Sequence, residues 1–447
     1  MPITSLPPEP TADTNTSALR TPSRDVLFTA LVLSCGGLLL GLRSLASDSP
    51  HVSPWITVAG WCGTLLGTLV VIFAHRIRLT AFRFRILRTF AVMLACASIL
   101  LFSWRVYYGL SHIHLLSCSD DSAVTVVAGG SAILSGQNPY ESWNNPKELL
   151  AKCNVVTFTL LRTGRFAGDY LQPSQAAVQQ ITKDILHGRT PQEVLSSYFY
   201  PIGNGLLGIF GAPAVILISA ASALVIVGFI IMRAPKAWRG MILLTTAAQL
   251  PFWGQFGVLN AAPFAFLLLL PAWFWPSSKG AAISTGLASA VRQIPWLSIP
   301  ALLGLAWAQS GFRKAFRAGI ILVATFLVVS LPFMWHIPAK WFHDVIAQQL
   351  VTIPNGAGLV TLFSSKLLPA VLAKCLSVLE TLLTVLAGVI AIRSGSTRPE
   401  RAALCSGLAI WAGPVSYAAH MAPVGMFVLL AYWGNILRAK HLTAPTV

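Results

Sequence analysis

Apolar runs of membrane-spanning length recur from one end of this chain to the other, and they limit its fold more than any other feature. A lone helix needs ~20 apolar residues to cross the hydrocarbon core of a bilayer. Composition agrees with this interpretation, because 55% of the residues are hydrophobic, 10% are charged and the mean hydropathy is +0.70. A membrane β-barrel would instead show short segments of alternating hydrophobicity. The sequence therefore predicts an all-α polytopic membrane protein.

The hydropathy pattern predicts a bundle of about 12 transmembrane helices, some of them short. The expected spans are 25–43, 55–75, 89–108, 212–232, 241–252, 254–275, 281–293, 295–308, 318–335, 366–392, 404–419 and 421–437. Breaks in the pattern near Gly254, Pro295 and His420 predict pairs of short helices that meet near the outer surface. Such breaks are tolerated where the backbone lines a cavity or is covered by protein.

The distribution of charge predicts the orientation of the bundle. The chain has 31 basic and 14 acidic residues, and most of the basic ones fall in short clusters between apolar spans on one side of the predicted bundle. The positive-inside rule makes that side cytoplasmic. We therefore expect a disordered cytoplasmic tail over 1–24, a transmembrane domain over 25–437 and a cytoplasmic tail over 438–447, in the cytoplasmic (inner) membrane of the cell. The outer loop regions are then 109–200 and 336–365.

The net charge of +17 does not indicate nucleic-acid binding, because no soluble basic domain and no zinc-ligand spacing accompany it. The clusters instead suit anionic lipid headgroups. Seven cysteines are scattered, and only Cys118 and Cys153 fall in the long outer region, where a disulfide could persist. Their pairing stays open, since sequence does not show connectivity.

The acidic doublet Asp120-Asp121 opens an apolar stretch within the long outer region. Residues 122–135 are small and apolar, and they predict a helix along the membrane surface or against the bundle; 174–197 predicts a second, polar helix. Aspartate before a helix start is a favoured N-cap. Because neighbouring side chains in a helix point about 100° apart, one carboxylate can cap while the other faces a substrate. A cap alone and a catalytic carboxylate both remain open.

Other polar residues stand at the ends of apolar spans, where each has a structural and a functional interpretation. Arg292 either snorkels to the surface or binds an anionic headgroup. His420 is either a hydrogen-bonded structural residue or a phosphate or proton ligand. Gln255 and Asn260 either bridge helices or bind hydroxyl groups. Metal-ligand spacing, a phosphate-binding glycine loop and a nucleophile elbow are all missing from the sequence.

Taken together, these motifs resemble glycosyltransferase family 87, whose members are polytopic enzymes of the GT-C type. The resemblance covers residues ~89–437. It rests on the outer Asp followed by Gly136-x-Asn138-Pro139-Tyr140, on Tyr200-Pro201, on Gly254-Gln255 with Asn260, on Arg292 with Pro295, and on Pro414-x-Ser416-Tyr417-x-x-His420. The chain departs from the family pattern at three positions. Ala419 replaces the first His of a His pair, Tyr417 replaces a Trp, and Arg292 replaces a Lys.

The resemblance implies a GT-C-like bundle and transfer of a sugar, typically mannose, from a polyprenyl-phosphate donor to an acceptor hydroxyl of a glycan, glycolipid or protein. It implies inversion at the anomeric carbon and no necessary metal or cofactor. Spacing to Gly136 favours Asp121 as the general base, with Asp120 as orienter or alternate. Substrate binding is expected from Arg292, His420, Gln255, Asn260, Tyr140 and Tyr200.

Three other classes stay open. A lipid-linked glycan transporter would need ionisable residues along a path through the membrane, whereas apart from the cytoplasmic basic clusters they gather here mainly at the outer face, with few in mid-span. A polysaccharide polymerase or ligase usually carries Arg and His in its outer loops rather than a leading Asp. A non-catalytic subunit of an envelope complex would use the doublet only as a helix cap.

Overall fold

The computed structural model describes most of the chain between residues 121 and 416. The described residues are 121–142, 159–168, 173–189, 191–233, 261–356, 369–413 and 415–416, with scattered positions at 89–112, 359–363 and 427–434. The expected spans 25–43, 55–75 and 241–252 therefore lie outside the described residues, as do the breaks near Gly254 and His420.

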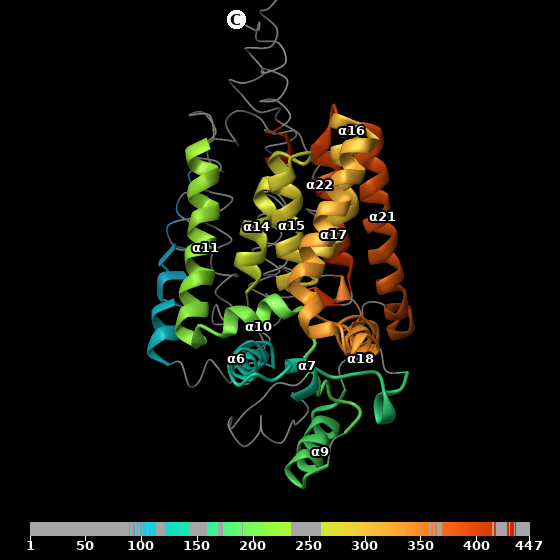
Figure 1. The fold of residues 1–447 in the computed structure, drawn as a ribbon. Helices are drawn as coiled ribbons and strands as arrows, with labels where there is room; N and C mark the ends of the chain where they lie inside the picture. The colour runs from blue at the N-terminus through green and yellow to red at the C-terminus, as the bar shows by residue number, and fades with distance from the viewer. Residues whose placement is uncertain are drawn as a thin grey trace, which may run out of the picture.

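The described part of the chain is all-α apart from a parallel pairing of two residues each, β1 (Asn355–Gly356) with β2 (Val415–Ser416). Its long body consists of α11 (Gly211–Arg233), α14 (Ala262–Phe274), α15 (Lys279–Val291), α16 (Ile299–Ser310), α17 (Phe312–Met334), α21 (Leu376–Ser394) and α22 (Pro399–Ala412). These helices run roughly side by side in Figure 1. Neighbours pack in the order α11–α14–α15–α17–α16–α21–α22, so the sequence-distant α16 and α21 lie in contact.

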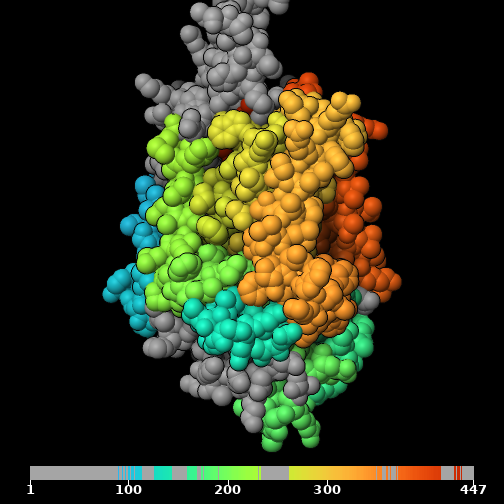
Figure 2. All heavy atoms as spheres, viewed as in Figure 1, coloured from blue at the N-terminus to red at the C-terminus, as the bar shows by residue number. Residues whose placement is uncertain are grey.

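Among the described residues, three helical segments are long and apolar enough to cross a membrane: Gly211–Phe229, Phe312–Met334 and Val371–Ser394. The other helices of the body have 12 to 14 residues each. Short spans were expected, and the pair around Pro295 is confirmed: α15 and α16 meet through the short 3-10 helix η3 (Ile294–Ser298). Figure 2 shows α17 on the surface of the body, where many of its large apolar side chains are exposed.

Several predicted boundaries were wrong, and turn chemistry explains two of them. Helix α17 begins at Phe312 rather than at 318, because Gly311, with φ +85°, ends α16 and starts the next helix at once. Helix α22 ends at Ala412 rather than at 419, because Gly413 precedes Pro414 and is extended (ψ 156°), as residues before proline prefer.

A second layer of short helices crosses one end of the body. It contains α6 (Asp121–Leu134), α7 (Pro139–Ser142), α10 (Ile202–Gly208), α18 (Pro338–Phe342) and α19 (Gln348–Val351), with α9 (Gln175–Leu186) farther out (Figure 1). The helices expected over 122–135 and 174–197 are therefore confirmed as α6 and α9, the second being shorter than predicted. We call this end of the molecule the capped end.

Charged residues separate between the two ends. Basic residues lie at the end opposite the capped end, where α11 and α21 finish and α15 and α17 begin (Figure 1). They are Arg233 of α11, Lys279 of α15, Arg313, Lys314 and Arg317 of α17, and Arg393 of α21. The capped end holds Asp184, Glu193 and Asp344, each paired with a local base. In the described residues the acids thus gather at the capped end, with Glu400 beside Arg398 as an exception at the opposite end. The bases do not segregate as fully as predicted, because Arg165, Arg189 and Lys340 lie at the capped end.

Candidate functional site

Three of the residues singled out from the sequence come together at the capped end: Tyr140, Tyr200 and Arg292. The Tyr140 hydroxyl donates a hydrogen bond of 2.8 Å to the backbone oxygen of Tyr200. The guanidinium carbon of Arg292 lies 4.3 Å from the centre of the Tyr200 ring, a cation–π distance. All three side chains are buried. We call this group the Tyr–Arg cluster.

The turn that was expected after α6 positions Tyr140. Gly136 adopts φ +72°, which an L side chain rarely accepts, and so ends the helix. The Asn138 amide then donates to the Phe333 oxygen of α17 at 2.7 Å and accepts from the Tyr140 backbone N–H at 3.2 Å. Asn138 therefore joins α7 to the end of a long helix and presents Tyr140 to the cluster.

Arg292 follows the last residue of α15 and is its C-cap. Its neighbour Gln293 donates from Nε2 to the Phe199 oxygen at 2.6 Å, which fixes the turn against the segment before α10. Arg292 is only 4% exposed, and its Nε has no hydrogen-bond partner among the described residues. No described carboxylate forms an ion pair with it. A buried cation without a counter-charge is costly, so the position favours an anionic ligand.

Tyr198 belongs to the same cluster, although the sequence analysis did not select it. Its ring meets the Tyr140 ring edge-on at 5.1 Å and lies against Gly129 of α6 and Gly205 of α10. Burial raises the pKa of both phenols well above the ordinary value, so both stay protonated. They can donate hydrogen bonds but cannot act as bases near neutral pH. Its place two residues before Tyr200 was a usable signal, since alternate residues of an extended segment share a face.

An ion triad lies next to the cluster. Asp344 is buried and accepts from Lys340 Nζ at 2.6 Å and from His343 Nδ1 at 3.1 Å. It stands in a π-helical turn, His343–Ala347, a geometry frequent at functional sites. Trp341 and Val345 from the same stretch pack into the apolar core around Tyr140. Because both Asp344 oxygens are engaged, we interpret the triad as a support of the cluster rather than as its base.

Helix α6 places Asp121. Gly130 of α6 and Gly208 of α10 meet with no room for a side chain between the helices, so α6 is held firmly across the capped end. Asp121 is the first residue of α6, and at a rise of 1.5 Å per residue it lies about 12 Å along the helix axis from Gly129, which touches Tyr198. The direction of its carboxylate lies outside the described structure.

The remaining predicted site residues are not described. Asp120, Gln255, Asn260 and His420 lie outside the described residues, as does the possible Cys118–Cys153 pair. Among the described residues, no group of three His, Cys, Asp or Glu side chains could hold a metal ion. The described part of the site therefore consists of one buried cation and its aromatic and amide surroundings.

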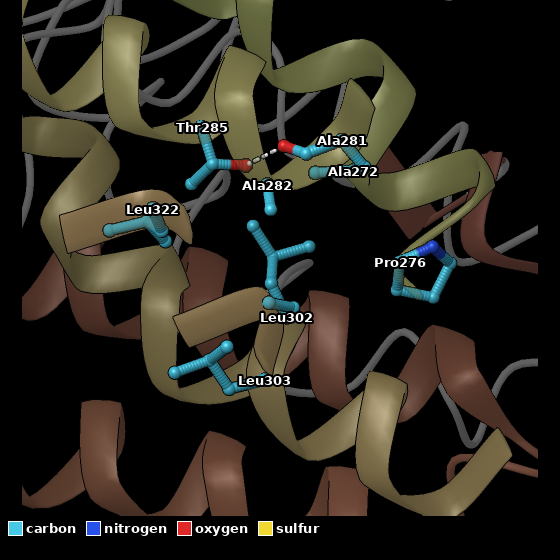
Figure 3. Close-up of a pocket in the computed structure, with 9 residues that line it drawn as sticks. Ala272, Pro276, Ala281, Ala282, Thr285, Leu302, Leu303 and Leu322 are labelled. Atoms are coloured by element: carbon cyan, nitrogen blue, oxygen red, sulfur yellow. Dashed lines mark hydrogen bonds between the residues drawn. The ribbon is translucent and has the colours of Figure 1, made fainter. Parts of the chain in front are cut away.

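A small hollow of about 10 Å³ lies elsewhere, between α14, α15, α16 and α17 (Figure 3). Its lining is apolar except for Thr285, whose hydroxyl donates to the Ala281 oxygen at 2.8 Å. Thr285 lies in the middle of α15, whereas Arg292 caps the C-terminal end of that helix. The hollow offers no unpaired polar group and is not part of the Tyr–Arg cluster.

Comparison with known proteins adds no assignment. No protein-family model, no curated protein and no solved structure matches the chain. The fold and the cluster themselves define the class: an all-α protein whose described part has three helices able to cross a membrane and a buried cation at one end of the helical body.

Proposed function

We propose that this chain is an integral membrane glycosyltransferase that transfers a sugar, mannose in the first instance, from a polyprenyl-phosphate donor to an acceptor hydroxyl. One observation carries the proposal. Arg292 is buried at the C-terminal end of α15, stacked on Tyr200 and without a described counter-charge. A phosphate that carries an apolar chain supplies the missing anion and suits a site beside apolar helices.

The proposed reaction needs a base and a stabilised leaving group. As the bond between the acceptor oxygen and the anomeric carbon forms, the bond from that carbon to the phosphate oxygen breaks, and polyprenyl phosphate leaves as an anion. Asp121 takes the proton of the acceptor hydroxyl, with Asp120 as orienter or alternate. Arg292, together with His420, stabilises the charge that develops on the phosphate.

The described contacts refine the roles of the two tyrosines. The Tyr140 hydroxyl is already engaged by the Tyr200 oxygen, and the Tyr200 ring by the Arg292 guanidinium. We therefore assign both residues to holding Arg292 in place rather than to direct sugar contacts. Gln255 and Asn260 keep the sugar- or acceptor-binding role that the resemblance implies.

The proposed orientation puts the capped end outside. Six bases at the opposite end of the described helices satisfy the positive-inside rule if that end is cytoplasmic. The Tyr–Arg cluster then faces the outer side of the cytoplasmic membrane, where lipid-linked sugars rather than nucleotide sugars are the accessible donors.

The test is a transfer assay with radiolabelled polyprenyl-phosphate mannose on membranes that contain the protein. Arg292→Ala should lower transfer about 10²–10³-fold, the usual cost of losing one donor to a developing charge. Arg292→Ala should change how the rate of transfer depends on donor concentration more than how it depends on acceptor concentration. Arg292→Lys keeps the charge but loses the planar stack on Tyr200. Its rate of transfer should therefore fall between those of the wild type and Arg292→Ala.

Arg313→Ala is the matched control, because Arg313 is exposed in the first turn of α17 at the opposite end. It should transfer as the wild type does. Equal losses in both variants would contradict the role of Arg292. Wild-type membranes that move labelled donor across the bilayer without transferring its sugar would indicate a transporter instead, and membranes that do neither would favour a non-catalytic subunit.

A further inference from the structure

Asn204 is a buried amide beside the Tyr–Arg cluster, and its side chain forms no hydrogen bond with the described residues. It lies in α10 and is 0% exposed, and both its Nδ2 and its Oδ1 lack a partner among the described residues. A buried amide left unpaired costs about 1–3 kcal/mol for each unsatisfied group. Among the described residues the Asn204 amide makes no hydrogen bond that would hold α10 in place, so the side chain is better explained by a ligand than by stability.

Two connections place the backbone of Asn204 near the end of α15 that carries Arg292. Its neighbour Gly203 packs so closely on α15 that a Cβ at Gly203 would lie 2.7 Å from the Ala290 oxygen, two residues before Arg292. Along the chain, Asn204 comes four residues after Tyr200, whose ring contacts the Arg292 guanidinium. The Asn204 backbone N–H donates to the Pro201 oxygen at 3.1 Å, which holds the first turn of α10 in place.

The chemistry of an amide differs from that of the neighbouring cation. Arg292 offers donors and a positive charge, which suit a phosphate. The Asn204 amide offers two N–H donors and an oxygen acceptor, and both sides are free. That combination suits hydroxyl groups, which donate and accept, better than a phosphate oxygen, which only accepts.

We propose that Asn204 binds hydroxyl groups of the donor sugar while Arg292 binds the adjoining phosphate. This inference rests on the proposed function and adds a sugar-recognition residue to it. Because Asn204 is closed to solvent, the ligand must enter by displacing what covers the amide, and binding then satisfies groups that are unpaired in the ligand-free protein. The residue selects for the sugar of the donor and contributes nothing to holding the bare lipid phosphate.

The test compares the affinities of two probes for purified protein in lipid nanodiscs: polyprenyl phosphate and polyprenyl-phosphate mannose. Asn204→Leu, which replaces the amide by an apolar side chain of similar volume, should weaken binding of the mannosylated probe about 10-fold. Binding of polyprenyl phosphate should not change. Arg292→Ala should weaken both probes.

Thermal unfolding without ligand supplies a second readout and a matched control. Asn138→Leu is the same substitution at an amide that is satisfied by Phe333 and Tyr140, so it should lower the midpoint of unfolding. Asn204→Leu should keep or raise it, because an unpaired buried amide is removed. Asn204→Ser, which retains a hydroxyl, covers the case in which the leucine variant does not fold, and it should weaken the mannosylated probe alone.

The outcomes separate the two proposals. If the Asn204 variants bind both probes as the wild type does, sugar recognition by Asn204 is overturned and the glycosyltransferase proposal stands. A drop in the unfolding midpoint of Asn204→Leu as large as that of Asn138→Leu would also overturn it, since the amide would then be structural. If the wild type binds neither probe, both proposals fail.

Discussion

The hydroxyl of Tyr140 donates a hydrogen bond of 2.8 Å to the backbone oxygen of Tyr200, sixty positions farther along the chain. The bond joins α7 to the segment that enters α10, and the Tyr200 ring in turn carries the Arg292 guanidinium at 4.3 Å. The long outer region and the end of α15 are thereby connected through buried side chains. Disturbing either end of this connection should change the position of the buried cation.

The Tyr140–Tyr200 bond gives the first prediction. Tyr140→Phe removes the donor in a fully buried position, so it should lower the free energy of unfolding by about 1–3 kcal/mol. Thermal unfolding in detergent measures the loss. Tyr107→Phe is the matched control, because Tyr107 is 70% exposed and should tolerate the change. Equal effects at both positions would contradict a structural role for the buried bond.

The proposed base gives the second prediction. Asp121→Asn should lower sugar transfer about 10²–10⁴-fold, the usual contribution of a general base, while folding persists because Asn serves as well as Asp at a helix start. Glu141→Gln is the same chemical change at an exposed carboxylate of α7 and should leave transfer intact. Full activity in Asp121→Asn, with loss in Asp120→Asn, would move the base to the neighbouring residue.

The contact of α6 with α10 gives the third prediction. A methyl group at Gly208 would collide with the Val126 backbone oxygen, so Gly208→Ala should push the two helices apart and cost about 1–3 kcal/mol, as overpacking does. Because α6 carries Asp121, transfer should fall with stability. Gly228→Ala in α11 is the control: a Cβ there meets nothing within 4 Å. Measuring unfolding and transfer for both variants tests whether the tight contact matters.

The outer ion cluster gives the fourth prediction. The Arg165 guanidinium lies 2.7 Å from Asp184 and 3.2 Å from Glu193. The hydrogen bond from Arg165 lowers the pKa of Asp184. Burial alone would raise the pKa of Glu193, but hydrogen bonds from the Arg165 backbone and side chain outweigh it and lower that pKa as well.

Lowered carboxyl pKa values make the cluster stabilising above the ordinary carboxyl pKa of about 4, and that contribution is lost as the pH falls through the folded-state values. Residues 160–193 should therefore become more open to proteolysis on acidification to about pH 3 than at pH 7. Arg165→Gln should remove most of this pH dependence and make the segment open at both values. A segment equally protected in acid and at neutral pH would contradict the prediction.

Much of the helical body could be predicted from the sequence. Apolar runs around 212–232 and 295–308 reappear as α11 and as η3 with α16, because a backbone in an apolar setting must satisfy its own hydrogen bonds within a helix. The break at Pro295 was predictable from proline chemistry. The exact starts and ends were less so, since Gly311 and Gly413 fix them through local turn geometry that hydropathy does not contain.

The candidate site shows the opposite balance. The sequence alone selected Arg292 as a polar residue at the end of an apolar run, and it selected Tyr140 and Tyr200 through the resemblance of their motifs to a known family. Only the tertiary structure decided that these three meet, that Tyr198 joins them, and that Asn204 and the Arg292 Nε are buried without described partners. The reason is physical: residue type and spacing determine what a side chain can do, whereas long-range packing determines which groups it meets and which it leaves unpaired.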